Sequence, residues 1–194
     1  YLTGGTALAE FYLHHRKSVD IDLFTEKEEV NFKSIDAFLK KISQKLRIKK
    51  FDRSQFLGLV SYKLIYEDKE ELKVDFNYYP FPPINKGVNY KGLKVDSIND
   101  IAANKIHTLF MKPRGRDYVD LYCIINEYNF SLRKLILDAK AKFDWDIDRI
   151  TLASQFLKVC DFPPDYQMLV PFNPKDMETF YLKLAKSLEK DIFK

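Results

Sequence analysis

The sequence has few cysteines and glycines and no long apolar run, and each absence excludes a class of protein. Its 194 residues include only two cysteines, Cys123 and Cys160, which excludes a disulfide scaffold or a cysteine-rich zinc site and suits a reducing cytoplasm. No stretch approaches the roughly 18 consecutive apolar residues of a membrane span, so we expect no membrane partner. The six glycines and eight prolines are scattered, which excludes collagen-like and low-complexity classes.

Charge, by contrast, is abundant and nearly balanced. The chain carries 32 Lys and Arg against 28 Asp and Glu, a formal net charge of +4, and 46% of its residues are hydrophobic. These are the proportions of an ordinary globular protein, and the length suits one domain or one domain with a closely packed extension. The slight basic surplus is compatible with a nucleotide or nucleic-acid partner without requiring one.

Hydrophobic patterns divide the chain into two unlike halves. In the first we predict a strand end at 1–3, a Gly-Gly turn, helices at 6–15 and 31–50, a strand at 19–24, a β-hairpin of 58–66 and 72–78, and a strand at 93–95. In the second we predict helices at 97–111, 117–128, 131–142, 147–159 and 175–190. The expected fold is α+β, with a small mixed β-sheet flanked by helices (1–96) and a helical C-terminal region packed on it (97–194). Because Tyr1 is not preceded by Met and falls at a strand end, we expect a helix and a strand before it.

Two of the predicted strands place carboxylates on one face of the sheet. Residues two apart in a strand project to the same side, so Asp20 and Asp22 point together while Val19 and its alternate neighbours face the core. On the second hairpin strand, Lys73 and Asp75 share a face by the same rule. Carboxylates that converge repel each other unless a cation intervenes, and hard oxygen ligands favour Mg²⁺ or Mn²⁺ over zinc. The alternative is a set of solvated charges on an exposed sheet face.

The turn before the first of these strands has the composition of a phosphate site. Gly4 and Gly5 stand between a strand end and a helix, where they allow close backbone approach and direct amides toward an anion. Thr6 adds a hydroxyl. A Gly-Gly pair alone is weak evidence, because turns use glycine in any case. Followed by carboxylates on the next strand, it is the combination that a triphosphate–metal site requires.

The first helix of the C-terminal region carries a lysine among apolar residues. Lys105 falls inside the stripe formed by Ile98, Ile101, Ala102 and Leu109. A lysine there costs free energy unless it reaches solvent or meets an anion. On the next helix, Asp117 lies on an apolar stripe with Asp120 beside it, which predicts packed helices that share a Lys105–Asp117 pair; the alternative is that Asp117 only favours its helix N-terminus. The lysine then either binds a triphosphate or takes part in proton transfer, and Arg114 and Arg116 are further phosphate contacts or solvated loop residues.

These segments together resemble a known family. The sequence is similar to the AbiEii/MenT-type nucleotidyltransferases, toxins of abortive-infection type IV toxin–antitoxin systems with a DNA polymerase β-like nucleotidyltransferase fold. Four motifs appear in the order of that family: LTGGTAL (2–8), HRKSVDIDLF (15–24), NKIHTL (104–109) and RDYVDLY (116–122). The match spans most of the chain, and the four motifs are specific only when taken jointly.

The resemblance implies roles for individual residues. It implies nucleotide-binding roles for residues of the first two motifs: Gly4, Gly5, Thr6, Arg16 and Ser18. It implies metal binding by Asp20 and Asp22, and catalytic roles for the third-motif lysine and the fourth-motif acid: Lys105, and Asp117 or Asp120. Asp75 is our candidate for the third carboxylate of the superfamily, in both metal binding and catalysis.

The resemblance also implies a reaction, in which a substrate hydroxyl attacks the α-phosphate of a nucleoside triphosphate (NTP) and releases pyrophosphate, assisted by two Mg²⁺. Members of this kind add nucleotides to tRNA 3′ ends, and a cognate antitoxin is an expected partner. The residues themselves leave open whether the acceptor is tRNA, another RNA or a protein. One basic run either attracts RNA phosphates or is a solvated face: Lys40, Lys41, Lys45, Arg47, Lys49 and Lys50. The competing hypotheses are a catalytically silent nucleotide- or RNA-binding module that acts through a protein partner, and a metal-dependent nuclease.

Overall fold

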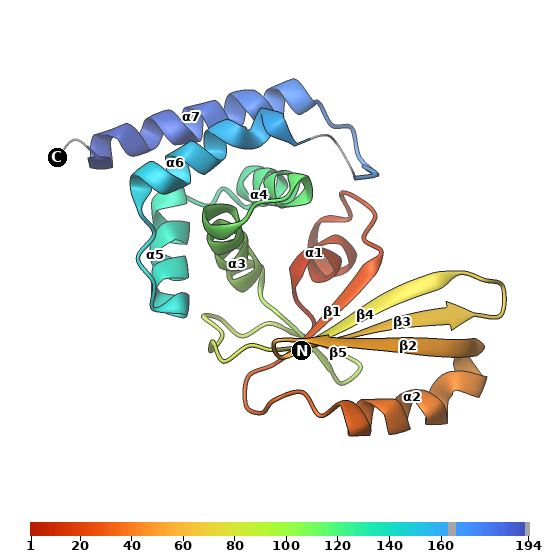
Figure 1. Ribbon diagram of the computed structural model, residues 1–194. Helices are drawn as coiled ribbons and strands as arrows, with labels where there is room; N and C mark the ends of the chain where they lie inside the picture. Colours follow the sequence, from red (N-terminus) through yellow and green to blue (C-terminus); the bar gives the residue numbers. More distant parts are fainter. Residues whose placement is uncertain (163–165, 193–194) are drawn as a thin grey trace.

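The computed structural model describes residues 1–162 and 166–192, and it places a β-sheet beside a layer of helices (Figure 1). The elements in chain order are α1 (Gly4–Leu8), the π-helical turn η1 (Ala9–Leu13), β1 (Asp20–Thr25), α2 (Phe32–Leu46), β2 (Ile48–Phe56), β3 (Leu59–Tyr66), β4 (Glu71–Tyr78), β5 (Val88–Tyr90), β6 (Leu93–Val95), α3 (Ile98–Met111), α4 (Gly115–Tyr128), α5 (Leu132–Phe143), α6 (Arg149–Leu157), the 3₁₀ turn η2 (Lys158–Asp161) and α7 (Pro174–Ile192). The α+β class predicted from the sequence is confirmed.

The main sheet has four strands in the order β1-β4-β3-β2. β1 runs parallel to β4, and the other pairs are antiparallel, including the predicted hairpin of β3 and β4. The register sets Asp20 beside Lys73 and Asp22 beside Asp75, so these four side chains share a face as expected. Val19 was expected in the core, but it precedes β1 and is 70% exposed, because the alternation of the strand begins only at Asp20.

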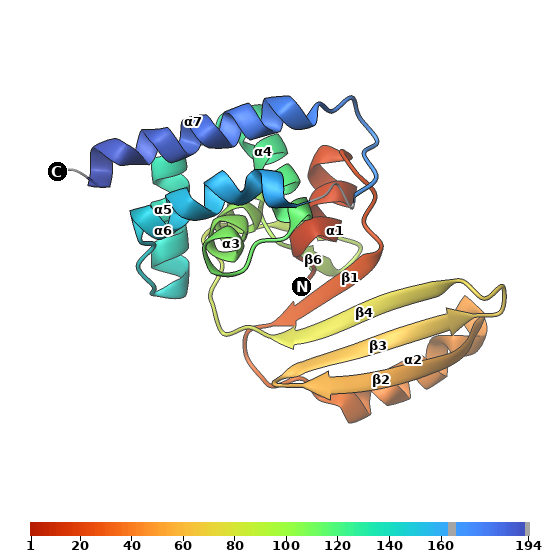
Figure 2. The same cartoon turned by 45° about the horizontal axis from the view of Figure 1, so that its top comes forward.

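Helix α2 covers the opposite face of this sheet (Figure 2). Its Leu39 packs into a cluster with side chains that alternate with the polar ones on β3 and β4: Val60, Tyr62, Leu64 and Val74. The Asn31 side chain begins the helix by accepting a hydrogen bond from the Ser34 amide. The helix ends at Leu46, because Arg47 adopts a left-handed conformation (φ 56°). The predicted helix at 31–50 was therefore too long at its C-terminal end.

Strand β2 follows directly and was not predicted. It is the edge strand of the sheet and most of its side chains are exposed, so its sequence lacks the alternating apolar residues that mark a half-buried strand. β5 was missed as well, because its three residues are all exposed. Within residues 1–162 and 166–192, no helix is long and apolar enough to cross a membrane.

The helical layer is built around α3. Ile101, Ala102, Ile106 and Leu109 of this helix are fully buried in the larger of the two hydrophobic clusters. α3 packs against α1, α4, α5 and α6, while α7 lies over α4 and α6 at the outside of the layer (Figure 1). Helix α1 thus stands between this layer and β1, which brings the residues around the Gly-Gly turn close to both halves of the molecule.

Candidate active site

Three carboxylates lie on the open face of the sheet, the face that α2 does not cover. Asp20 and Asp22 project from β1, and Asp75 projects from the adjacent strand β4 beside Asp22. The two Asp75 oxygens each accept a hydrogen bond of 2.6 Å, one from Ser61 Oγ and the other from Lys73 Nζ. The parallel pairing of β1 with β4 is the feature that brings Asp75 beside Asp22, a residue 53 positions earlier in the chain.

The surroundings of Asp22 disfavour the ionised form of its carboxyl group. Burial, then the charges of Asp75 and Asp20, raise the pKa of Asp22 above its ordinary value, and the nearby Lys73 opposes the rise. A divalent cation bound at Asp22 would stabilise its ionised form.

The Gly-Gly turn lies directly against these carboxylates. Gly4 has a left-handed backbone (φ +73°), which favours glycine, and a Cβ there would be in ordinary contact with Asp22 Oδ2 at 3.4 Å. The Thr6 hydroxyl lies 2.7 Å from Ser18 Oγ and also donates to the Asp20 carbonyl oxygen. Thr6 therefore fixes the start of β1 relative to the turn and does not project into free space.

The segment between α1 and β1 buries two basic residues that the site uses. The π-helical turn η1 ends at His14, whose left-handed conformation (φ 49°) redirects the chain so that His15 and Arg16 enter the protein. Arg16 donates from Nε and Nη2 to the two oxygens of Asp120, at 2.6 and 2.8 Å. His15 Nε2 lies 2.9 Å from the same carboxylate. Sequence reasoning singled out Arg16 only through the family motif and did not find His15.

Lys105 is buried between two aspartates of α4. Its Nζ lies 2.7 Å from Asp117 Oδ1 and 2.6 Å from Asp120 Oδ2, which confirms the predicted Lys105–Asp117 pair and adds a second partner. Burial alone would lower the pKa of Lys105, but Asp120 and Asp117 together raise it. The same contacts, with those of His15 and Arg16, hold the pKa of Asp120 well below its ordinary value despite burial. Lys105 therefore stays charged and both aspartates stay ionised.

Two arginines connect this buried cluster to the carboxylates of the sheet. Arg114 precedes α4 and donates from Nε to Asp117 Oδ2 at 2.9 Å, while the Asp117 side chain accepts from the Arg114 amide. Arg116 Nη1 lies 3.6 Å from Asp20 Oδ2. The N-terminal end of α4 thus faces β1, and its arginines lie within reach of any anion bound between the two.

One small pocket is lined by nearly all of these groups: Gly5, Arg16, Ser18, Asp20, Asp22, Lys73, Asp75, Lys105, Arg114 and Arg116. Sequence analysis anticipated every one of them as a site residue except Lys73. Four predicted site residues do not line it. Gly4 and Thr6 shape the turn, and Asp117 and Asp120 lie behind Lys105 and the arginines with no exposed surface.

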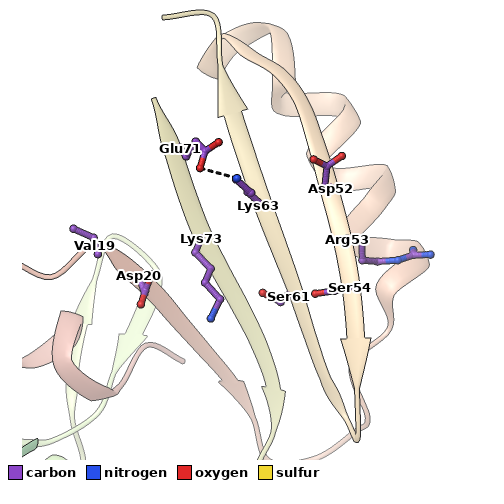
Figure 3. Close-up of a pocket in the computed structure, with 9 residues that line it drawn as sticks. All are labelled: Val19, Asp20, Asp52, Arg53, Ser54, Ser61, Lys63, Glu71 and Lys73. Carbon is purple, nitrogen blue, oxygen red and sulfur yellow. Dashed lines mark ion pairs between the residues drawn. The ribbon is translucent and has the colours of Figure 1, made fainter. Parts of the chain in front are cut away.

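A larger groove of about 510 Å³ adjoins this pocket on the open face of the sheet (Figure 3). It shares Asp20 and Lys73 with the carboxylate pocket, and its other polar lining includes Ser54, Ser61 and Lys63. Figure 3 shows the Lys73 side chain lying along β4 between Asp20 and Ser61. The small carboxylate pocket and the open groove are therefore contiguous.

The carboxylates fit a divalent cation when a phosphate shares it. Across residues 1–162 and 166–192, no group of three or more His, Cys, Asp or Glu side chains is arranged to hold a metal by protein ligands alone. Mg²⁺ is commonly bound by one or two carboxylates together with substrate phosphates, and Asp20 and Asp22 offer such a pair. Asp75, held by Ser61 and Lys73, stays a prediction as the third ligand.

The fold is shared with solved structures from Helicobacter pylori. The protein JHP933 is 20% identical and has a TM-score of 0.62, covering 98% of this chain and 83% of its own. A second H. pylori structure, provisionally named a nucleotidyltransferase, is 19% identical with a TM-score of 0.63, covering 98% of this chain and 86% of its own. At 19–20% identity these likenesses show the fold alone, and the class of protein follows from comparison of sequences.

Sequence comparison gives the family within that class. Residues 1–185 match the family described as "Nucleotidyl transferase AbiEii toxin, Type IV TA system". The chain belongs to this family of nucleotidyltransferase toxins, as the four motifs indicated. It is also 28% identical over 192 residues to an uncharacterised protein of Aquifex aeolicus, covering 97% of this chain and 88% of that protein.

The contact between Gly5 and Arg16 gives a first testable prediction. A Cβ at Gly5 would clash with Arg16 Nη2, which Asp120 holds in place, so we expect Gly5→Ala to cost about 1–3 kcal/mol of stability. Urea unfolding of a double-mutant cycle with Arg16→Ala measures it. The cost of Gly5→Ala should largely disappear in the Arg16→Ala background, and an equal cost in both backgrounds would contradict this reason.

Proposed function

We propose that this protein is a Mg²⁺-dependent enzyme that transfers a nucleoside monophosphate from an NTP to a hydroxyl of RNA. The preferred acceptor is the 3′ end of tRNA, and the transfer arrests growth as the toxin of an abortive-infection system with a cognate antitoxin. The observation that carries the proposal is the single pocket in which the Gly-Gly turn, the paired carboxylates and the buried cation cluster meet. Membership of the AbiEii family supports the toxin role.

The residues of the pocket suit the binding of a triphosphate. Lys105, Arg114 and Arg116 are cations at its border, and because Asp117 and Asp120 hold Lys105 in the charged form, it provides fixed positive charge for the phosphates and is not a proton acceptor. Asp20 and Asp22 would hold the metal ions, which supply charge stabilisation at the α-phosphate when bound. The acceptor hydroxyl gives up its proton to water as its oxygen bonds to the α-phosphorus. The bond from the α-phosphorus to the bridging oxygen of the β-phosphate breaks, and pyrophosphate leaves with that electron pair.

The groove on the open face of the sheet is the route by which we expect the acceptor to approach, since it shares Asp20 and Lys73 with the carboxylate pocket. The basic run that the sequence suggested for RNA attraction is less well placed. Lys40, Lys41 and Lys45 belong to α2, on the opposite face of the sheet from the carboxylates, and Lys49 and Lys50 lie in β2. These lysines can attract RNA to the molecule but do not line the pocket.

A transfer assay tests the proposal. Purified protein is incubated with each α-labelled NTP in turn and with tRNA, a 3′-blocked tRNA, unrelated RNA or total protein as acceptor. We expect label from a preferred NTP on tRNA and none on the blocked form. NTP binding without transfer to any acceptor would favour the silent binding module, and shortened RNA without an NTP requirement would favour the nuclease.

Removal of the divalent metal is expected to stop the reaction. Because carboxylates and triphosphate repel each other without a bridging cation, EDTA should lower transfer to background, and added Mg²⁺ or Mn²⁺ should restore it. Ca²⁺ at matched ionic strength serves as the control for ionic effects. Transfer that continues in EDTA would contradict the metal-dependent chemistry.

The cellular role has its own test. Expression of the chain alone should arrest growth, and co-expression of the gene product encoded next to it should relieve the arrest. Arrest that persists when Asp22 or Lys105 is replaced by alanine would contradict the proposal that nucleotide transfer is the toxic activity.

A further inference from the structure

Lys73 was not anticipated as a site residue, yet its ammonium group lies among the three carboxylates. It is 2.6 Å from Asp75 Oδ2, it stands beside Asp20 in the strand register, and its charge acts on Asp22. No other cation has a contact this short with these three side chains in the described part of the chain, the next being Arg116 at 3.6 Å from Asp20. Lys73 therefore supplies the main local compensation of the negative charge.

The two partners of this ion pair differ in their freedom to move. The Asp75 side chain is 9% exposed and is also held by Ser61, whereas the Lys73 side chain is 50% exposed. A lysine has a long flexible stem with several rotatable bonds, and exposure means that little packing opposes its rotation. The carboxylate is the fixed member of the pair, and the ammonium group is the mobile one.

A divalent cation bound by the same carboxylates would conflict with this position of Lys73. Like charges a few ångströms apart repel strongly at a partly buried site. The adjoining groove offers Lys73 a place to go, since this residue lines both the pocket and the groove and Ser54 and Ser61 are polar groups nearby. Because the Lys73 side chain is half-exposed, its ammonium group can leave Asp75 and remain in contact with solvent.

We propose that Lys73 is an exchangeable counter-ion of the active site. It neutralises the Asp20–Asp22–Asp75 group when divalent metal is absent, and metal binding displaces it into the open-face groove. There it presents a positive charge to the phosphates of an incoming acceptor, so that metal occupancy prepares the acceptor route. This inference rests on the proposed function, because it takes these carboxylates to be the metal site.

The test is direct measurement of metal binding, which needs no catalysis. Mn²⁺ is titrated into the full chain at low ionic strength, and free Mn²⁺ is followed by electron paramagnetic resonance for the wild type, Lys73→Met, Lys63→Met and Asp22→Asn. Met retains the length of the lysine stem without its charge. Lys63 is the matched control, because it lies directly across from Lys73 on the same sheet face and is 52% exposed, but its 2.7 Å ion pair is with Glu71 and not with the three carboxylates.

We expect Lys73→Met to bind Mn²⁺ more tightly, by roughly 3- to 10-fold, because a competing charge is removed from a partly screened site. Lys63→Met should change the affinity less than about twofold, in keeping with screening at an exposed site. Metal-free Lys73→Met should also melt at a lower temperature than the wild type, and Mn²⁺ should raise its melting temperature by the larger amount.

Two results would overturn the inference, and they differ in what they say about the proposed function. If Lys73→Met binds Mn²⁺ with unchanged or lower affinity while Asp22→Asn loses binding, the carboxylates are the metal site but Lys73 is not its competitor. If the wild type binds no Mn²⁺ even with a non-hydrolysable NTP, or if Asp22→Asn binds as well as the wild type, the metal site of the proposed function fails as well.

Discussion

Asp22→Asn is expected to abolish nucleotide transfer while leaving the protein folded. Asn keeps the shape of the side chain but has no negative charge, so the pair of carboxylates that would hold a metal with the triphosphate is lost. Loss of one fixed electrostatic group in an active site lowers turnover by about 10²–10³-fold, and loss of a metal ligand should reach at least the upper end. Single-turnover transfer of label from the preferred NTP measures the effect.

The stability of metal-free Asp22→Asn, in contrast to its activity, should be unchanged or increased. Because burial and the charges of Asp75 and Asp20 raise the pKa of Asp22, its ionised form is less favourable in the folded chain than in the unfolded one at neutral pH. A neutral side chain removes that repulsion, so the urea midpoint of metal-free Asp22→Asn should equal or exceed that of the wild type. The increment should be largest at neutral pH and should vanish as the pH falls below the ordinary value of 3.8.

Asp138→Asn is the matched control for this experiment. Asp138 pairs with Lys134 on α5, far along the chain from the carboxylate motifs, and its replacement should leave transfer unchanged. If Asp22→Asn kept its transfer rate within about tenfold of the wild type, Asp22 would not be a metal ligand of the reaction. The loss of rate would then be smaller than the loss expected from removing a single electrostatic group. A large loss of stability in Asp22→Asn would show instead that the carboxylate has a structural role.

The carboxylates on the open face of the sheet were predictable, because side chains alternate between the two faces along each strand. Asp20 and Asp22 are two residues apart in β1, and Asp75 has the same phase in β4, so their common face follows once both strands are recognised. What the alternation does not contain is the order of the strands. The parallel pairing of β1 with β4 joins segments that are far apart in the sequence, so the pattern within each strand does not predict it. This pairing places Asp75, rather than a residue of another strand, beside Asp22.

The errors have local physical causes. The helix predicted to extend to Lys50 ends at Leu46, because Arg47 takes a left-handed conformation. Glycine or asparagine usually occupies such a position and reveals the helix end in the sequence, but arginine does not. β2 escaped prediction because an exposed edge strand needs no apolar alternation. Lys73 was placed on the correct face, yet an exposed lysine on a strand has no sequence feature that distinguishes an active-site contact from a solvated charge.

The buried cluster around Lys105 was predicted in part, because burying an unpaired charge is unfavourable. Lys105 was recognisable because a lysine inside an apolar stripe requires a buried anion. Asp120 lies beside Asp117 on α4 and was recognisable in the same way. Its further partners, His15 and Arg16, come from a segment that enters the protein only after the π-helical turn and the left-handed His14. Irregular backbone of this kind is set by tertiary packing, so pattern analysis did not reach it.

Asp120→Ala is expected to have the largest effect on stability of any single substitution in the site. Asp120 is fully buried and contacts Lys105, Arg16 and His15, so its loss leaves buried cations with too few anions. Breaking a buried ion pair from one side typically costs about 3–5 kcal/mol, a large share of the total stability of about 5–15 kcal/mol of such a domain. Urea unfolding followed by circular dichroism measures the change, and Asp146→Ala, which removes an exposed pair with Lys140, is the control expected to differ little from the wild type.

The pH dependence of a second variant, Asp120→Asn, separates charge from packing. Since the folded state holds the pKa of Asp120 well below its ordinary value of 3.8, its contribution is complete at neutral pH and is lost as the pH falls below that value. The difference in unfolding free energy between wild type and Asp120→Asn, which keeps the volume of the side chain, should therefore be constant at neutral pH and shrink on acidification. A difference that stays constant down to the acid transition would mean that the charge of Asp120 does not stabilise the folded protein.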